Sequence, residues 1–164
     1  MIVQTEYDGM FCQEIPWDYA LKLWSEIEPF VIQALEYDLY GSTSTEKIKK
    51  QVSTGFARVL VCTATTDDAI LSATIVQLHQ NVKQERVLHV VTTAGTNSTA
   101  WLPALVEAWK LIAAEQSCDA ITLAGRPGWA RKMKQFGFKT EQIVMRMNDD
   151  GWIQQEQVKL EAVR

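Results

Sequence analysis

The sequence predicts an α/β (α+β) domain with a mixed, mostly antiparallel sheet and helices on both faces. Two amphipathic segments come first, and three apolar segments joined by short polar turns follow them, which is typical of an antiparallel meander. A long amphipathic helix and another apolar strand come next, as in a crossover between parallel strands. A chain of 164 residues forms one domain by length and can bury a sizeable core.

The first helical segment starts after Pro16, and its apolar residues recur at helical spacing as far as Leu35. Pro29 lies inside this segment and has no backbone N–H. We therefore expect a kink or a split near Glu28.

A polar loop over residues 41–45 separates this segment from a second helix. Ser44 or Thr45 can cap that helix, which we expect to continue through Val52. The three strands of the meander are predicted from Ala57 to Thr63, Ala69 to His79 and Arg86 to Thr93.

The clearest helix follows residues 95–99, and it tolerates Pro103 in its first turn. The segment from Asp119 to Ala124 is apolar on both faces, as in an interior strand. A short helix should then end at Gly137, before a strand from Thr140 to Met147. Residues 152–160 are predicted as a last strand or a loose helix. This organisation gives one domain over 1–147 and a C-terminal extension over 148–164.

Composition excludes several classes of protein. The N-terminus lacks the basic-then-apolar order of a signal peptide, and no apolar run approaches the roughly 18 residues of a membrane span. Cys12, Cys62 and Cys118 are odd in number and lack the histidine spacing of a zinc site. We expect them to be small buried apolar residues in a reducing compartment, with no metal bound.

The order of elements, together with three motifs, resembles the GNAT acetyltransferase family over roughly residues 17–147. The motifs are C-x-x-I-x-L from Cys118, QFGF over residues 135–138, and GRPGW over residues 125–129. The last motif, with AGTNSTAW upstream, is similar to small GNAT-like proteins encoded by bacteriophages. The resemblance implies a GNAT-like sheet and a loop before the long helix where acetyl-CoA binds.

In active members of the family, that loop carries an Arg or Gln followed by glycines, whose amides meet the cofactor pyrophosphate. Here the first position falls on Asn97, and the glycine positions fall on Ser98, Ala100 and Leu102, with Trp101 between the last two. No cation is present and the side chains are larger, so we predict a degraded cradle. If acetyl-CoA does bind, the resemblance implies that five residues contact it: Gly95, Thr96, Asn97, Ser98 and Arg126.

The resemblance also places a general acid, a tyrosine, at the position of Met133, which has no proton to transfer. His89 and Glu85 are weak candidates for a general base. A strand histidine is commonly a hydrogen-bonded structural residue, so neither position compels a catalytic role. Some acetyltransferases work without the tyrosine, and the alternative of an active N-acetyltransferase stays open.

Charge is unevenly distributed along the chain, whose net charge is −4. Residues 1–40 hold eight acids against Lys22 alone, and residues 120–140 hold five cations and no acid. The cluster of Arg126, Arg131, Lys132 and Lys134 suits phosphates, nucleic acid, an acidic protein surface or solvent. Nucleic acid is the weaker hypothesis, because the acidic remainder opposes it.

We therefore expect a phage-type GNAT-like protein with a vestigial catalytic site and no cofactor. Its expected partner is an acidic surface of a virion protein, a host protein or a second copy, in the host cytoplasm or the virion. An exposed Trp17, Trp24 or Trp152 would mark an interface better than any cation.

Overall fold

The structure is a computed structural model that describes residues 2–37, 41–143 and 145–149. The chain divides into two compact units, one up to Pro127 and one from Gly128 onward, and each is described by itself. The first unit contains one six-stranded sheet in the order β1-β2-β3-β4-β5-β6. Neighbouring strands are antiparallel from β1 to β5, and β6 pairs with β5 in parallel. The predicted mixed, mostly antiparallel sheet is confirmed.

The sheet begins with a hairpin that our sequence analysis did not identify, formed by β1 (Gln4–Tyr7) and β2 (Met10–Ile15). Its turn contains Asp8 and Gly9, whose φ angles are +46° and +77°. Asp-Gly with both residues at positive φ is the favoured turn for a two-residue hairpin loop. The dipeptide was therefore an available signal.

The first helical segment is split, but not where Pro29 predicted. Helix α1 (Trp17–Lys22) and helix α2 (Trp24–Leu35) meet at Leu23, and Pro29 lies inside α2. The expected split near Glu28 is therefore wrong. Pro29 and Ser25 are both exposed, so the Ser25 carbonyl, which loses its helical donor, can bond to water.

Helix α3 (Thr45–Ser53) is capped by Ser44, whose hydroxyl accepts a hydrogen bond from the Lys47 amide at 3.2 Å, as predicted. The meander consists of β3 (Ala57–Ala64), β4 (Ile70–Gln80) and β5 (Arg86–Gly95). Helix α4 (Ser98–Glu115) then leads to β6 (Ala120–Leu123). These elements confirm the predicted strands and crossover.

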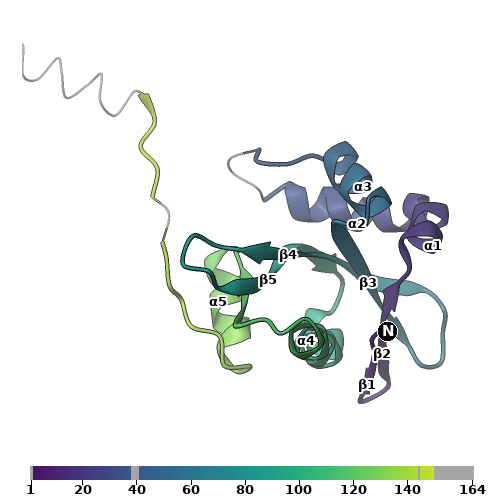
Figure 1. The fold of residues 1–164 in the computed structure, drawn as a ribbon. Helices are drawn as coiled ribbons and strands as arrows, with labels where there is room; N and C mark the ends of the chain where they lie inside the picture. The colour runs from purple at the N-terminus through teal and green to yellow at the C-terminus, as the bar shows by residue number, and fades with distance from the viewer. Residues whose placement is uncertain (1, 38–40, 144, 150–164) are drawn as a thin grey trace, which may run out of the picture. The chain divides into compact units, whose positions relative to one another are not determined.

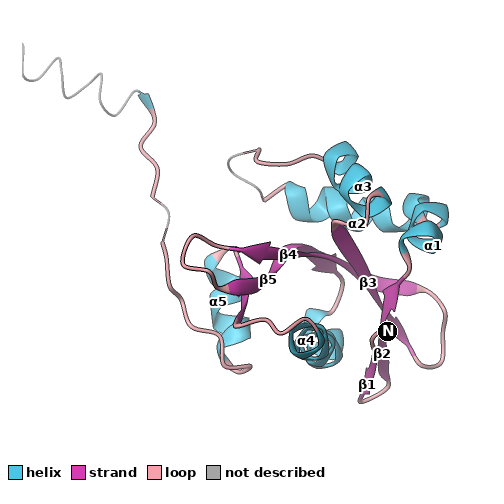
Figure 2. Ribbon diagram, in the orientation of Figure 1, coloured by secondary structure: helices cyan, strands magenta, loops and turns pink. Residues whose placement is uncertain are grey.

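Helices cover both faces of the sheet, with α1, α2 and α3 on one side and α4 on the other (Figures 1 and 2). The first side holds an apolar core built from α2, α3, β3 and β4. On the second side, the Thr5 hydroxyl of β1 donates to the Ala104 carbonyl of α4 at 2.6 Å. Both layers bury apolar residues, which is what stabilises an α/β sandwich of this size.

The second unit starts with helix α5 (Pro127–Lys134). Gly137 has φ +90°, and its amide donates to the Lys134 carbonyl while the Phe138 amide donates to the Met133 carbonyl. These two bonds and the positive φ form a Schellman motif, so Gly137 ends the helical turns as predicted.

The predicted strand from Thr140 to Met147 is wrong. The described residues of this segment belong to no ladder, and the alternating Ile143, Met145 and Met147 are exposed. Alternation alone does not make a strand, because a strand needs a hydrogen-bonded neighbour. The last element predicted, over residues 152–160, lies outside the described residues. No helix within the described ranges is long and apolar enough to cross a membrane.

Candidate functional site

The sheet opens where the parallel strands β5 and β6 stop pairing. Their ladder runs from Val87 opposite Ala120 to Val90 opposite Leu123, where β6 ends. Strand β5 continues to Gly95, and the change of register against β4 leaves Val91 as an extra, bulged residue. In α/β sheets, ligands bind outside the carboxyl ends of parallel strands. The opening beyond Val90 is therefore the candidate site.

Gly95 stands at the end of β5, and the structure explains why it is glycine. A Cβ placed there would collide with the Leu71 carbonyl oxygen and would lie 2.6 Å from the Ser72 Cβ. The absent side chain is therefore required by the close approach of β4, which packs against Gly95 directly. Gly95 was predicted to contact acetyl-CoA if the cofactor binds, and in the structure it packs against the neighbouring strand.

The loop that follows is polar and uncharged. The Thr96 amide donates to the Leu71 carbonyl at 3.3 Å. Asn97 adopts a left-handed conformation with φ +56° and precedes the first helical residue, Ser98. The Asn97 side-chain oxygen accepts a bond from the Thr99 hydroxyl at 3.2 Å. The exposed groups of this loop are thus hydroxyls and amides.

Trp101 and Leu102 lie in the first turn of α4, and both are 1% exposed. The Trp101 indole N–H donates to the Thr96 carbonyl at 2.7 Å, which ties the loop to the helix. Their bulk therefore lies in the core, and the steric part of our expectation is wrong: these side chains do not crowd the exposed face of the loop. The electrostatic part of the expectation was that the loop carries no cation. Residues 95–102, all of which the structure describes, include no Lys or Arg.

Arg126 follows β6 and was expected to contact acetyl-CoA only if the cofactor binds. Its guanidinium carbon lies 3.5 Å from the centre of the Tyr37 ring, at the end of α2. This geometry is a cation–π contact between the chain after β6 and the helical layer. The donor set beside α4 therefore consists of helix amides and hydroxyls, and residues 95–102 add no cation to it.

His89 lies on β5 one residue before the end of the parallel ladder. Its Nδ1 is 2.9 Å from the Thr122 hydroxyl of β6, and its ring centre is 5.8 Å from that of His79 on β4. Burial, and to a smaller extent the His79 ring, lowers the pKa of His89, so the imidazole is neutral at pH 7. A neutral imidazole can accept a proton.

His79 extends this cluster on the face covered by α1–α3. Its Nε2 is 2.9 Å from the Gln77 side-chain oxygen, and Gln77 donates to the Gln51 oxygen of α3 at 2.7 Å. The Phe56 ring meets the His79 ring edge-on, with centres 6.0 Å apart. Our sequence analysis did not bring these residues together, although the hairpin between β4 and β5 places His79 and His89 near each other.

Glu85, the other candidate base, is engaged in the β4–β5 turn. Its carboxylate accepts a bond from the Asn81 side-chain amide at 2.9 Å, and its own amide donates to the Asn81 side-chain oxygen at 3.0 Å. It lies at the amino end of β5, away from the opening after Val90. The structure therefore does not bring Glu85 and the opening together.

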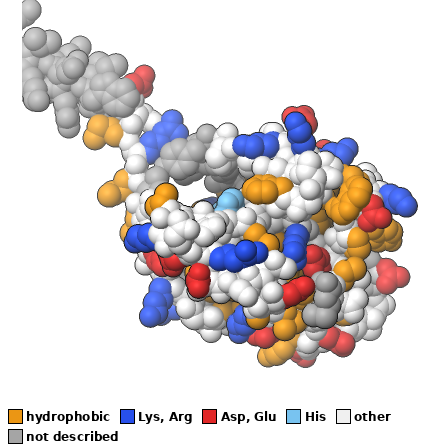
Figure 3. Space-filling view, viewed as in Figure 1, with side chains coloured by type: hydrophobic (Ala, Val, Ile, Leu, Met, Phe, Trp, Pro, Cys, Tyr) orange, Lys and Arg blue, Asp and Glu red, His pale blue; other side chains and the backbone are white. Residues whose placement is uncertain are grey.

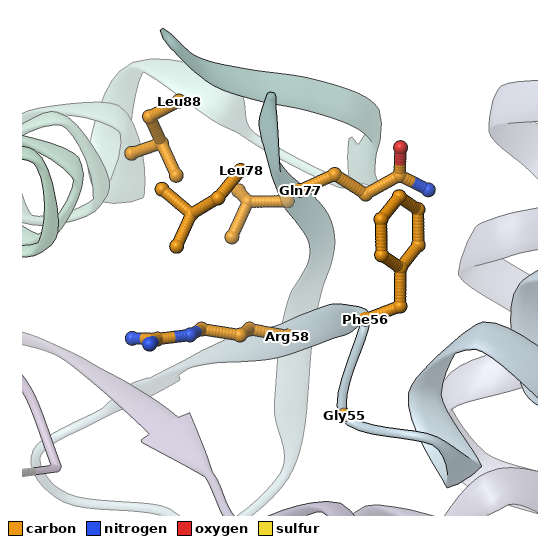
Figure 4. Close-up of a pocket in the computed structure, with 7 residues that line it drawn as sticks. Gly55, Phe56, Arg58, Gln77, Leu78 and Leu88 are labelled. Carbon is orange, nitrogen blue, oxygen red and sulfur yellow. The ribbon is translucent and has the colours of Figure 1, made fainter. Parts of the chain in front are cut away.

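A small hollow of about 170 Å³ lies near the amino end of β5 (Figure 4). Arg58 extends below Leu78 and Leu88, while Phe56 and Gln77 lie on the opposite side of the hollow. The Arg58 guanidinium is 3.5 Å from the Glu14 carboxylate, so its charge is already balanced. The described residues contain no group of three side chains placed to hold a metal ion.

The predicted partner-binding cations fall in different units. Arg131, Lys132 and Lys134 are exposed on α5, and the Lys132 amine lies 5.6 Å from the centre of the Trp129 ring. Trp17 is 54% exposed on α1, whereas Trp24 is 4% exposed, and Trp152 lies outside the described residues. Figure 3 shows cationic and anionic side chains interspersed on one face, where a histidine also reaches the surface.

No family model matches the sequence, and no curated protein matches it either. Solved structures do match the fold. One is the tetramutant of the BH1408 protein from Bacillus halodurans, with a TM-score of 0.64 and 14% identity over 84% of this chain and 98% of the other. Another is an aminoglycoside acetyltransferase from an uncultured soil metagenomic sample, with a TM-score of 0.62 and 11% identity over 85% and 95%.

A third is the ribosomal-protein-alanine N-acetyltransferase from Brucella melitensis, with a TM-score of 0.59 and 15% identity over 85% of this chain and 99% of the other. At these identities the similarity concerns the fold. The six-stranded sheet, the crossover through α4 and these matches agree, and the chain has the fold of the GNAT acetyltransferases.

Proposed function

We propose that this GNAT-fold protein acts by binding a partner, and that its cofactor site is vestigial. The observation that supports this is the absence of any cation from residues 95–102, together with the stacking of Arg126 on Tyr37. A diphosphate held by helix amides alone lacks the cationic side chain that would balance its charge and add bidentate contacts.

The proposed docking surface is the exposed face of α5, formed by Arg131, Lys132 and Lys134. The proposed partner is an acidic protein surface, and a second copy of this chain offers one. Within residues 1–37, Glu14 pairs with Arg58, and Glu28 accepts a bond from the Trp24 indole. Five other acids are exposed there, namely Glu6, Asp8, Asp18, Glu26 and Glu36. Trp17 adds an exposed aromatic anchor on the same segment.

The resemblance in GRPGW and AGTNSTAW extends this proposal to a phage-type protein in the virion, in its assembly, or acting on a host protein. Detection of the chain in purified phage particles tests the virion role. Its absence from particles in which the structural proteins are detected would contradict that role.

The second candidate is an active acetyl-CoA-dependent N-acetyltransferase. It is favoured by the opening beyond Val90 and by the neutral His89 imidazole one residue away, which could accept a proton from an amine. It is also favoured by fold similarity to a predicted acetyltransferase from Clostridium acetobutylicum, whose structure was solved with acetyl-CoA. Acetyl-CoA, when bound, would supply the acetyl group.

Calorimetric titration of the whole chain with acetyl-CoA separates the two candidates, with the Clostridium protein as positive control. We expect no heat of binding and no change in melting temperature. A ligand at 100 times its Kd stabilises a protein by about 2.7 kcal/mol, which is easily detected as a rise in Tm. Micromolar binding would replace our proposal with the second candidate.

A charge-reversal variant tests the docking surface. We expect R131E/K132E/K134E to abolish self-association measured by sedimentation velocity at low salt. The control K47E/K49E/K50E makes the same charge change on exposed lysines of α3 and should leave self-association intact. Equal association by both variants, or a wild-type chain that stays monomeric at every concentration, would contradict a second copy as the partner.

A further inference from the structure

Two cysteines lie directly opposite each other on neighbouring strands. Cys12 of β2 is the register partner of Cys62 of β3, and both side chains are 0% exposed. Direct partners in an antiparallel pair project from the same face of the sheet. The two thiols are therefore neighbours across strands, although they are far apart in sequence.

The hydrogen-bond pattern of the ladder tells which kind of pair they form. The Thr65 amide donates to the Gly9 carbonyl at 2.9 Å, in the same register, so Gly9 and Thr65 form a hydrogen-bonded pair. The two kinds of pair alternate along an antiparallel ladder. After the hydrogen-bonded pair of Gly9 and Thr65, the pair at Met10 is non-hydrogen-bonded and the pair at Phe11 is hydrogen-bonded. The next pair, Cys12 with Cys62, is therefore non-hydrogen-bonded.

This assignment matters because side chains approach more closely at such pairs. Cα atoms at such pairs are typically about 4.5 Å apart, which is at the short end of the range of about 4.4 to 6.8 Å observed for disulfides. The register of β2 and β3 therefore places the two thiols where a disulfide can bridge the strands. Cys12 and Cys62 are free thiols in the structure.

The two thiols are also chemically different. A hydrogen bond from Cys12 lowers the pKa of the Cys62 thiol, against burial, which raises it, and the Ser72 hydroxyl lowers it further. The same hydrogen bond, together with burial, raises the pKa of Cys12. Cys62 is therefore the better nucleophile, and Cys12 is the thiol that keeps its proton.

We propose that Cys12 and Cys62 form a reversible redox pair, which a low-molecular-weight disulfide such as glutathione disulfide converts to an internal disulfide. The Cys62 thiolate attacks one glutathione sulfur, and the other glutathione leaves as a thiolate. Cys12 then loses its proton to solvent and attacks the Cys62 sulfur, which releases the second glutathione. Two protein thiols are oxidised, and one glutathione disulfide is reduced to two thiols.

Access to the buried pair requires a local opening of the edge of the sheet. Strand β1 is the edge strand and covers β2, and its Thr5 is the direct partner of Cys12. The bond from the Thr5 hydroxyl to the Ala104 carbonyl fastens this edge to α4. Opening of the β1–β2 hairpin therefore controls the rate of oxidation, and Thr5 acts as its latch.

The new bond would link β2 to β3 and close a loop that contains α1, α2 and α3. A cross-link across so long a loop stabilises the folded state by restricting the unfolded chain. Oxidation should therefore raise Tm by roughly 5 to 10 °C for a chain of this size.

The test uses the whole chain with Cys118→Ser, which leaves only the proposed pair. After incubation of the folded protein with glutathione disulfide, we expect a mass loss of two hydrogen atoms and a linked peptide containing Cys12 and Cys62. We also expect a higher Tm that dithiothreitol reverses. The control Cys12→Ala/Cys118→Ser should show no gain in Tm. Retention of both free thiols, stable glutathione adducts on either cysteine, or a lower Tm after cross-linking would overturn the proposal.

Thr5→Ala tests the route of access in the same background. Loss of the latch should speed formation of the disulfide several-fold. Thr99→Ala removes an exposed hydroxyl of α4 and is the matched control, with no expected change in rate. Equal rates for the two variants would exclude opening at β1.

Discussion

The two halves of β5 differ in how many strands pair with them. The amino-terminal half pairs with β4 on one side and β6 on the other, and its His89 is bonded to Thr122. Within the described part of the chain, the carboxyl-terminal half pairs with β4 alone, contains the bulge at Val91 and ends at Gly95. In the first half, neighbouring strands pair with both backbone edges of β5. In the described part of the second half, one backbone edge has no neighbouring strand. One strand can thus serve as both scaffold and site.

The largest effect is expected at the open half. Gly95→Ala places a Cβ against the Leu71 carbonyl and Ser72, which are largely backbone contacts that cannot rotate away. We expect a loss of about 2–3 kcal/mol in the free energy of unfolding, measured by urea denaturation. Gly128→Ala is the matched control, because nothing lies within 4 Å of its added Cβ. That change in α5 should be neutral or slightly stabilising.

A smaller effect is expected at the paired half. Thr122→Val keeps the shape of the side chain but removes the hydroxyl that meets His89 at 2.9 Å. We expect a loss of about 1 kcal/mol in unfolding free energy. Thr122→Ser retains the hydroxyl and should lose less. If the valine variant were as stable as wild type, the His89–Thr122 bond would not distinguish the two halves.

The contact between Arg126 and Tyr37 should contribute less, since both side chains are exposed. We expect Arg126→Ala to cost about 0.5 kcal/mol in thermal unfolding, as for other exposed cation–π pairs. Tyr37→Phe keeps an aromatic ring and should leave stability unchanged. A large loss in the phenylalanine variant would show that the tyrosine hydroxyl, and not the ring face, carries the contact.

The smallest effect is expected from pH, because His89 is only half-buried. Its pKa in the folded state lies below the ordinary value of 6.5, so the unfolded chain binds the proton more readily. The contribution of neutral His89 to stability should be fully present above pH 6.5. It should be lost as the pH falls from 6.5 through the lower pKa of the folded state. Thermal unfolding between pH 7.5 and 5.5 measures this slope, and His89→Gln should flatten it. An unchanged slope in the variant would assign the pH dependence to other groups.

Local patterns predicted much of the fold because they act over a few residues. Helical spacing and the polar turn predicted α4, the Ser44 cap predicted the start of α3, and Gly137 marked the end of the turns after α5. The same reasoning failed where local preference was insufficient. Pro29 did not break its helix, because its solvent-facing position tolerates a missing donor, and residues 140–147 alternate without a paired neighbour.

The candidate site was predicted less well than the fold. The resemblance directed attention to Gly95 through Ser98 and to His89, but the sequence did not show that Gly95 is needed for β4 or that Glu85 belongs to a turn. The uncharged loop was visible from the sequence alone. The burial of Trp101 and Leu102 was not, because the direction of a side chain depends on what packs against the helix.

The sequence by itself determined the order of the elements from α3 to α5, the polarity of the loop before α4 and the uneven distribution of charge. Only the tertiary structure decided which distant residues meet: Cys12 with Cys62, His89 with Thr122, and Arg126 with Tyr37. The physical reason is that periodicity and capping depend on neighbours along the chain. Strand register and layer packing instead depend on the folding free energy of the whole domain.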